Sequence, residues 1–281
     1  MANQYLSDAF SDAVTTGPSL AAAPDTSNTW WTNWAAFVAQ NGSIPTQYAW
    51  HMEGGGGDMQ SSVASYKTIL SNAKLATDHV ININEYAVFS EQVPSGAAWW
   101  ISQLERVNAI GLRGNWLSTG ALHDFLAGLL GKPDAGTSAY RPTAGGYYPA
   151  AEFQVYKYYN KNMTGYRVDT EPTADKNGDI YSVVGEDRVR LLVGARVATG
   201  TWEIKISSLS SVGLPPNGTL NIHTYRFDGS SANHFQEFNQ ATDLGNYGHT
   251  YSGDSVTFPI YSMETTTGLA FEFSRTDVGI I

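Results

Sequence analysis

The sequence predicts an α/β region followed by an all-β region, namely a partial (β/α) barrel of about four strand–helix units and then an antiparallel β-sandwich. Two observations predict this. Up to residue 164, short strand patterns alternate with helical patterns, and such repeats form parallel sheets with right-handed crossovers. From residue 165 onward, short β-rich runs alternate with turn signals such as Asn217-Gly218 and Asp228-Gly229. We therefore expect two domains, residues 1–164 and residues 165–281.

Apolar side chains at helical spacing mark the helices of the first region, for example Val63, Tyr66 and Leu70 after the N-capping residue Asp58. The expected helices cover residues 3–13, 28–40, 59–73, 95–109, 121–130 and 149–160. The expected strands cover residues 14–16, 47–51, 79–84 and 112–116. Gly17-Pro18 is expected to stop the first of these strands.

The second region contains six apolar runs of strand length and no helical pattern. The expected strands cover residues 179–184, 189–197, 202–206, 220–227, 256–261 and 269–273. The segment Asp175 to Asp179 resembles a calcium-binding loop, but the closing Glu of such a loop is absent. A hairpin turn is therefore the favoured interpretation.

Composition excludes several classes of function. The net charge is −10, which disfavours nucleic acid and anionic membranes as partners, and no apolar run reaches the ~18 residues of a membrane span. There is no Cys, no His spacing of the HExxH type and no Walker or dinucleotide loop, so we expect neither a metal nor a cofactor. Charged residues make up only 15% of the chain and aromatic residues 12%, which suits an uncharged ligand such as carbohydrate.

The N-terminal residues Met1-Ala-Asn-Gln are polar and do not form a signal peptide. The location of the protein therefore stays open. We expect secretion if the chain is a fragment of a longer enzyme, and a cytoplasmic location otherwise.

The sharpest local feature is Glu85, which ends the apolar strand pattern at Ile83-Asn84 and is followed by Tyr86. In parallel barrels the active site lies at the C-terminal ends of the strands. A carboxylate at that end can act as a nucleophile or a proton donor. The alternative is a Glu that caps the next loop or pairs with Arg113.

Polar and aromatic side chains also end the neighbouring strands. His51 and Glu53 end the strand before Glu85, and Asn115 and Trp116 end the strand after it. We therefore expect one rim to hold carboxylates, an imidazole and an indole. His51 as a core histidine and Trp116 as packing remain alternatives. His123 either reaches the same rim or caps the helix expected over residues 121–130.

The order of these motifs resembles a known family, the barrel glycosidases of glycoside hydrolase family 39 and their fungal relatives, in the C-terminal half of the barrel and the appended sandwich. The motifs are Gly17-Pro18-Ser19, Trp50-His51, Ile83 to Ala87, Asn115-Trp116 and residues 149–165. The resemblance implies that Glu85 is the nucleophile ending strand seven. It also implies that His51 lines the sugar site and that Trp116 forms its floor, with Asn84, Tyr86 and Asn115 beside them.

The same resemblance implies that the first half of the barrel, with the usual acid/base, is missing. A complete barrel takes about 250 residues, whereas only residues 1–164 are available. Three interpretations remain open: a fragment of a longer enzyme, two chains that pair as a homodimer, or a lectin-like sugar-binding protein without turnover. In the enzymatic interpretation the chain is a retaining β-glycosidase, and Glu53 could in principle replace the missing acid/base.

Overall fold

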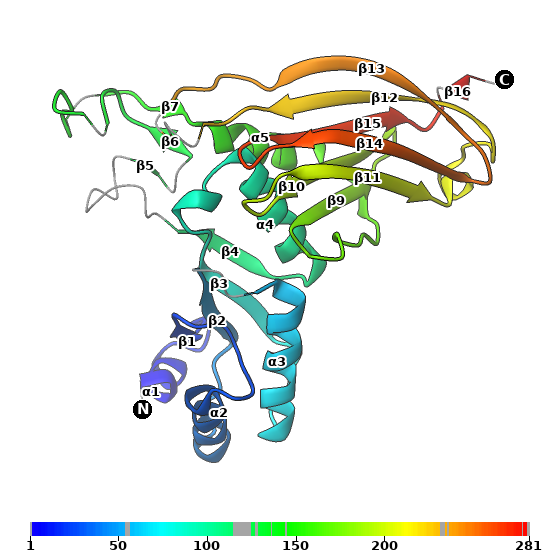
Figure 1. The fold of residues 1–281 in the computed structure, drawn as a ribbon. Coiled ribbons are helices and arrows are strands. Elements are labelled where there is room, and N and C mark those ends of the chain that lie inside the picture. The colour runs from blue at the N-terminus through cyan, green and yellow to red at the C-terminus, as the bar shows by residue number, and fades with distance from the viewer. Residues whose placement is uncertain are drawn as a thin grey trace. The chain divides into compact units, whose positions relative to one another are not determined.

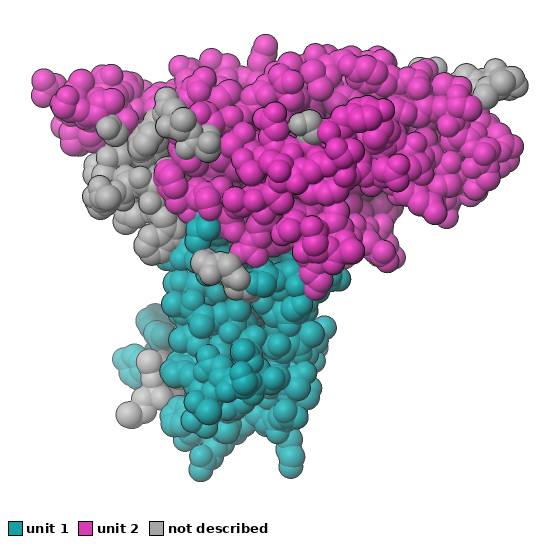
Figure 2. All heavy atoms as spheres, viewed as in Figure 1, with its two compact units in different colours: residues 1–88, 103–114 teal, residues 89–102, 115–281 magenta. Residues whose placement is uncertain are grey.

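The computed structural model describes residues 2–53, 57–114, 125–126, 129–135, 137–143, 145–230, 234, 236–276 and 278–279. The chain divides into two compact units (Figure 2), residues 1–88 with 103–114 and residues 89–102 with 115–281. No helix in the described ranges is long and apolar enough to cross a membrane. The division into domains at residue 165 stays a prediction.

The first unit contains a four-stranded parallel sheet in the order β1-β2-β3-β4 (Figure 1). Its strands are β1 Thr16–Leu20, β2 Gln47–Met52, β3 Val80–Tyr86 and β4 Ile110–Arg113. Helices alternate with these strands along the chain: α1 Ala2–Ala9, α2 Thr29–Asn41, α3 Met59–Asn72 and α4 Pro94–Arg106. Together with the antiparallel sheet of the second unit, this arrangement confirms the fold class expected from the sequence.

Local capping explains where α2 and α3 begin and end. The Asp58 side chain accepts a hydrogen bond from the Ser61 amide at 3.1 Å, which confirms Asp58 as the N-cap of α3. Asn28 caps α2 in the same way through the Trp30 amide. Gly42 closes α2 with a φ of 64°, a left-handed conformation that favours glycine.

The two faces of the parallel sheet differ in chemistry. On one face Tyr48 and Trp50 of β2 are fully buried against Trp31 of α2 and Tyr66 of α3, with ring centroids 5.3 to 6.1 Å apart. The other face carries amide side chains, and Asn82 Nδ2 donates to Gln47 Oε1 at 3.3 Å. Strand alternation thus gives the sheet one aromatic core face and one polar face.

The extent of β1 corrects the expected strand over residues 14–16. The observed strand begins at Thr16 and runs through Gly17-Pro18 to Leu20. Proline has no amide to donate, and it is tolerated here because β1 is an edge strand that, among the described strands, pairs with β2 alone.

The second unit contains a seven-stranded antiparallel sheet and a two-stranded sheet made of β11 and β14. The larger sheet runs β13-β12-β15-β10-β9-β8, and β16 also pairs with β12. The buried core of this unit draws on strands of both sheets and includes Leu191, Ile222, Phe258 and Phe271. The strands are β8 Tyr166–Arg167, β9 Gly178–Val184, β10 Arg188–Ala195, β11 Gly200–Ser207, β12 Gly218–Phe227, β13 Thr242–Tyr251, β14 Ser255–Met263, β15 Gly268–Ser274 and β16 Val278–Gly279. Two short 3-10 helices cover Phe89–Glu91 and Leu209–Val212.

The helix expected over residues 121–130 is wrong in its described part. Strands β5 Phe125–Leu126, β6 Leu130–Gly131 and β7 Tyr148–Pro149 form a small antiparallel sheet instead. Gly131 permits this pairing, because a Cβ there would lie 2.6 Å from Cζ of Tyr148. The last helix, α5 Ala151–Asn162, begins two residues later than expected, since Pro149 belongs to β7.

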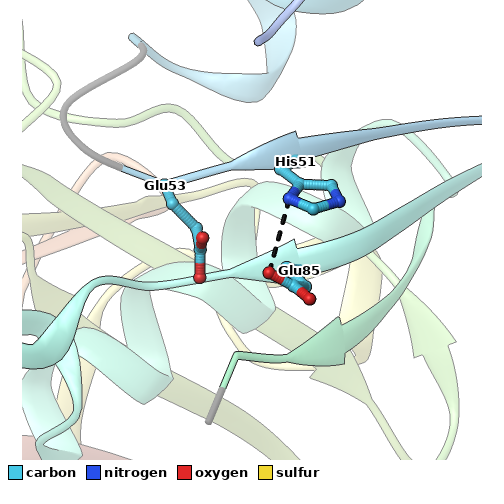
Figure 3. A group of neighbouring side chains, drawn as sticks. All are labelled: His51, Glu53 and Glu85. Carbon is cyan, nitrogen blue, oxygen red and sulfur yellow. Dashed lines mark ion pairs between the residues drawn. The ribbon is translucent and has the colours of Figure 1, made fainter. Parts of the chain in front are cut away.

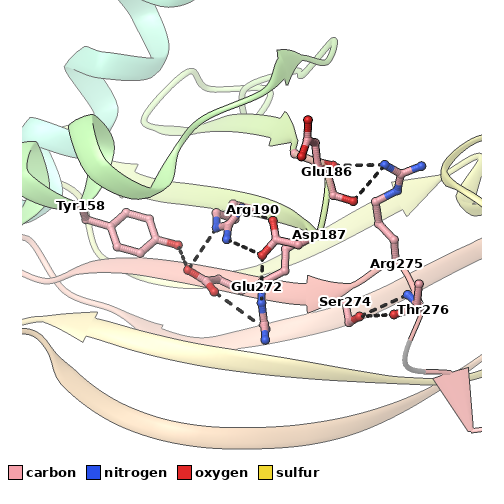
Figure 4. Close-up of polar contacts among 10 residues, drawn as sticks. Tyr158, Glu186, Asp187, Arg190, Glu272, Ser274, Arg275 and Thr276 are labelled. Atoms are coloured by element: carbon pink, nitrogen blue, oxygen red, sulfur yellow. Dashed lines mark hydrogen bonds and ion pairs between the residues drawn. The ribbon is translucent and has the colours of Figure 1, made fainter.

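A buried polar cluster joins α5 to the large sheet (Figure 4). The Tyr158 hydroxyl donates to Glu272 Oε1 at 2.6 Å, and Arg190 Nε lies 3.5 Å from the same oxygen. Arg190 also forms a two-pronged contact with Asp187 at 3.1 Å. Burial, reinforced by the Glu272 carboxylate, raises the pKa of the Tyr158 phenol far above its ordinary value.

Candidate active site

Two neighbouring parallel strands bring His51 and Glu85 together at their C-terminal ends (Figure 3). His51 Nδ1 lies 3.4 Å from Glu85 Oε2. The side chains remain accessible, with exposed fractions of 19% for His51 and 37% for Glu85. The pair can therefore meet a ligand from solvent.

A register shift between β2 and β3 creates this pair. Trp50 is opposite Ile83, but the next residue, His51, is opposite Glu85 where uninterrupted pairing would give Asn84. Such an irregularity changes the direction of a side chain without ending the sheet. Asn84 and Glu85 are consecutive, yet both reach the His51 imidazole.

Asn84 completes the arrangement from the other side of the ring. Its Nδ2 lies 3.1 Å from His51 Nε2. When the amide NH2 donates and Nε2 accepts, a neutral imidazole carries its proton on Nδ1, the nitrogen that faces the Glu85 carboxylate. The three side chains thus form one chain of contacts, with a hydrogen bond between the Asn84 amide and the imidazole and an ion-pair contact between the imidazole and Glu85.

Glu53, immediately after β2, belongs to the same group (Figure 3). One ligand atom each of His51, Glu53 and Glu85 can be chosen so that all lie within 4.8 Å of one another. One imidazole nitrogen and two carboxylate oxygens form a donor set that a divalent cation such as Zn²⁺ accepts. The sequence indicated no metal, and that expectation stays a prediction.

Tyr86 lies in the core of the first unit. Its ring is 4% exposed, and the Arg113 guanidinium carbon lies 5.9 Å from the ring centroid. The Tyr86 carbonyl accepts from the Gly114 amide at 2.9 Å and faces the Arg113 side chain at 3.5 Å. These contacts tie β3 to β4 next to Glu85, and a role of Tyr86 in ligand binding stays a prediction.

The structure therefore brings together four of the side chains expected at the rim: His51, Glu53, Asn84 and Glu85. The remaining rim candidates Asn115, Trp116 and His123 lie outside the described residues. The register shift was not expected, because a strand irregularity of this kind leaves no signal in apolar alternation.

Comparisons with known proteins bear on the fold. No protein-family model matches the chain, and no curated protein sequence matches it. The solved structures that are similar to this chain include the following three. N2152 from Neocallimastix frontalis is 19% identical with a TM-score of 0.77, and the match covers 97% of this chain and 63% of that one. A glucosidase from Croceicoccus marinus is 14% identical with a TM-score of 0.55, over 98% and 63%.

The third is a glycoside hydrolase family 44 endoglucanase from Clostridium acetobutylium, 14% identical with a TM-score of 0.56, over 97% of this chain and 59% of that one. The chain thus spans about three fifths of the length of the structures it matches. Identities this low bear on the fold alone. The chain has a glycosidase-like fold.

Proposed function

We propose that this chain acts on carbohydrate as a retaining β-glycosidase, with Glu85 as the nucleophile. The observation that carries the proposal is the chain of contacts Asn84–His51–Glu85 at the C-terminal ends of two adjacent parallel strands. Active sites of (β/α) barrels form at this end of the sheet. The glycosidase-like fold, and the glucosidase and endoglucanase among its neighbours, support carbohydrate as the substrate class.

The chemistry assigns a task to each side chain. Glu85 attacks the anomeric carbon and forms a covalent glycosyl ester, which water then hydrolyses. His51 holds the Glu85 carboxylate in one orientation through its Nδ1 proton, and Asn84 fixes the imidazole in that tautomer. A carboxylate held in place loses less freedom when it attacks, which lowers the barrier.

The finer assignment is to the family 39 type of glycosidase. It rests on the motif order described above, with Trp116 forming the floor of the sugar site and Asn115, Tyr86 and His123 beside it. This assignment implies β-linked substrates and retention of the anomeric configuration.

A mechanism-based label tests the proposal. The chain is incubated with 2,4-dinitrophenyl 2-deoxy-2-fluoro-β-glycosides of several sugars, which form long-lived esters with retaining nucleophiles. We expect a mass increase of one glycosyl group, located on Glu85 by peptide sequencing, and none in Glu85→Gln. Absence of an adduct across the sugars, together with no release of dinitrophenol from the unfluorinated glycosides, would contradict the proposal.

A second candidate is sugar binding without turnover. It is favoured by the four strands of the described parallel sheet, half the number that closes a barrel. In that case glycan binding persists unchanged in Glu85→Gln and the wild-type chain forms no covalent adduct. The same two proteins, tested on a glycan array and with the fluorinated label, separate the two functions.

We also propose that the chain forms a homodimer through the edge of this sheet. In β4, Ile110 and Leu112 are 50% and 63% exposed, which is unfavourable for aliphatic side chains in water. A second copy is the proposed cover, since two four-stranded sheets supply the eight strands of a barrel.

A further inference from the structure

We infer that Glu53 is the second carboxylate of this site, the general acid and base that works with Glu85. The inference rests on the proposed function and assigns the proton donor that the motif order leaves without a position. It goes against the expectation that the donor belongs to a strand outside this chain.

The spacing of the two carboxylates carries the inference. A ligand oxygen of Glu53 and one of Glu85 lie within 4.8 Å of each other. Retaining glycosidases place their two carboxyl groups roughly 5–5.5 Å apart, whereas inverting enzymes need roughly 6.5–9.5 Å to admit a water. A distance within 4.8 Å is too short for the water of an inverting enzyme and is nearer to the spacing of a retaining pair.

The residue before Glu53 is fixed in the core of the first unit. Met52, the residue before it, is buried, and the Ser62 hydroxyl of α3 contacts its sulfur at 3.5 Å. Met52 is thus fixed to α3. The Glu53 carboxylate lies on the same rim as His51, two residues further along the chain and immediately after the end of β2.

No other group in the described part of the chain matches this cluster. His51, Glu53 and Glu85 are the only set of three His, Asp or Glu residues there whose ligand atoms come this close. His51 faces Asn84 through one ring nitrogen and Glu85 through the other, so its imidazole has a positioning role. Glu53 is then the group left to transfer the proton.

The proposed steps balance as follows. As Glu85 bonds to the anomeric carbon, the glycosidic C–O bond breaks and the leaving oxygen takes the proton of the Glu53 carboxyl group. The Glu53 carboxylate then removes a proton from water, whose oxygen attacks the anomeric carbon and releases Glu85 as a carboxylate. The net reaction is hydrolysis, and both side chains return to their initial states.

The experiment compares wild type, Glu53→Ala and the control Glu264→Ala, an exposed Glu outside this cluster. Substrates are a methyl and a 2,4-dinitrophenyl β-glycoside, with and without sodium azide. For Glu53→Ala we expect kcat/KM on the methyl glycoside to fall about 100-fold or more, but to change little for the dinitrophenyl substrate, whose leaving group needs no proton. The kcat on the dinitrophenyl substrate should fall, because hydrolysis of the glycosyl ester has lost its base. Azide, which needs no base, should raise that kcat again and give the β-glycosyl azide.

The outcomes separate this inference from the proposed function. If wild type is labelled on Glu85 but Glu53→Ala behaves like Glu264→Ala with both substrates and gives no glycosyl azide, this inference alone is wrong. If wild type is not labelled, both are wrong. Loss of wild-type hydrolysis in EDTA with recovery on adding Zn²⁺ would also overturn it, because the three side chains would then be metal ligands.

Discussion

Asn84 Nδ2 lies 3.1 Å from His51 Nε2, on the opposite side of the imidazole from the Glu85 carboxylate. The amide thereby selects the imidazole tautomer, since a ring with its proton on Nε2 would direct two donors at each other. Asn84, next to Glu85 in sequence, thus contacts the proposed nucleophile Glu85 through a residue of the neighbouring strand.

The first prediction follows from this relationship. Asn84→Asp replaces the donor with an acceptor, so His51 should move its proton to Nε2 or become doubly protonated. Because the Glu85 carboxylate then loses its oriented partner, we expect kcat/KM to fall about 10- to 100-fold. Nitrogen-15 NMR of the imidazole reports the tautomer directly, independently of activity. An unchanged tautomer would contradict the prediction.

The second prediction concerns the start of α3. Asp58→Ala removes the side chain that accepts from the Ser61 amide and the Ser61 hydroxyl. We expect the free energy of unfolding, measured in urea, to fall by about 1 kcal/mol. Asp58→Asn keeps a capping oxygen and is the control, so an equal loss in both variants would argue against capping as the cause.

The fold was predictable where local chemistry determines it. Asp58 marks a helix start in the sequence, and the structure confirms its cap. Strand β13 was missed because Thr242–Tyr251 is polar and glycine-containing. Its place comes from pairing with β12 over Gly218 to Arg226, and pairing between distant segments leaves no local signal.

The site was predictable by residue but not by contact. The position of Glu85 and His51 after adjacent strand patterns indicated a shared rim, and their 3.4 Å contact is consistent with that expectation. The sequence gives no reason for Asn84 and Glu85 to reach the same imidazole, since alternation directs consecutive residues to opposite faces. The register shift after Trp50 supplies that reason.

The third prediction concerns the buried polar cluster that joins α5 to the large sheet. Tyr158→Phe removes the hydroxyl that donates to the buried Glu272 carboxylate at 2.6 Å. We expect a loss of about 1 to 3 kcal/mol in the free energy of unfolding, because a buried charge loses a hydrogen bond. Tyr247→Phe, an exposed tyrosine of β13, is the matched control and should change stability by less than ~0.5 kcal/mol.

The fourth prediction is a pH dependence. Burial on β13 next to Phe258, with ring centroids 5.1 Å apart, lowers the pKa of His249 below its usual value of about 6.5. Between pH 6.5 and the folded-state pKa the unfolded chain binds a proton that the folded chain does not, so stability falls as the pH falls.

Replacing His249 by Gln should flatten this dependence. Urea unfolding of wild type and His249→Gln at pH 8, 7, 6 and 5 measures it. At pH 8 the imidazole is neutral in both states, so the difference between the two proteins there is the packing effect alone. If the two stability curves stay parallel down to pH 5, the His249 assignment is wrong.

The last prediction tests the exposed edge of the parallel sheet. Leu112, at 63% exposure on β4, is the most exposed of the aliphatic side chains on that sheet for which burial is described. If a second copy covers this edge, Leu112→Glu places a carboxylate in an apolar contact, whose desolvation weakens association by several kcal/mol. Multi-angle light scattering should then show a dimer for wild type and a monomer for Leu112→Glu.

Tyr261→Glu, which changes an 80% exposed tyrosine of the sandwich, is the control and should stay dimeric. Weak dimers have dissociation constants up to roughly 100 µM. A wild-type chain that is still monomeric at that concentration would exclude a second copy as the cover of β4.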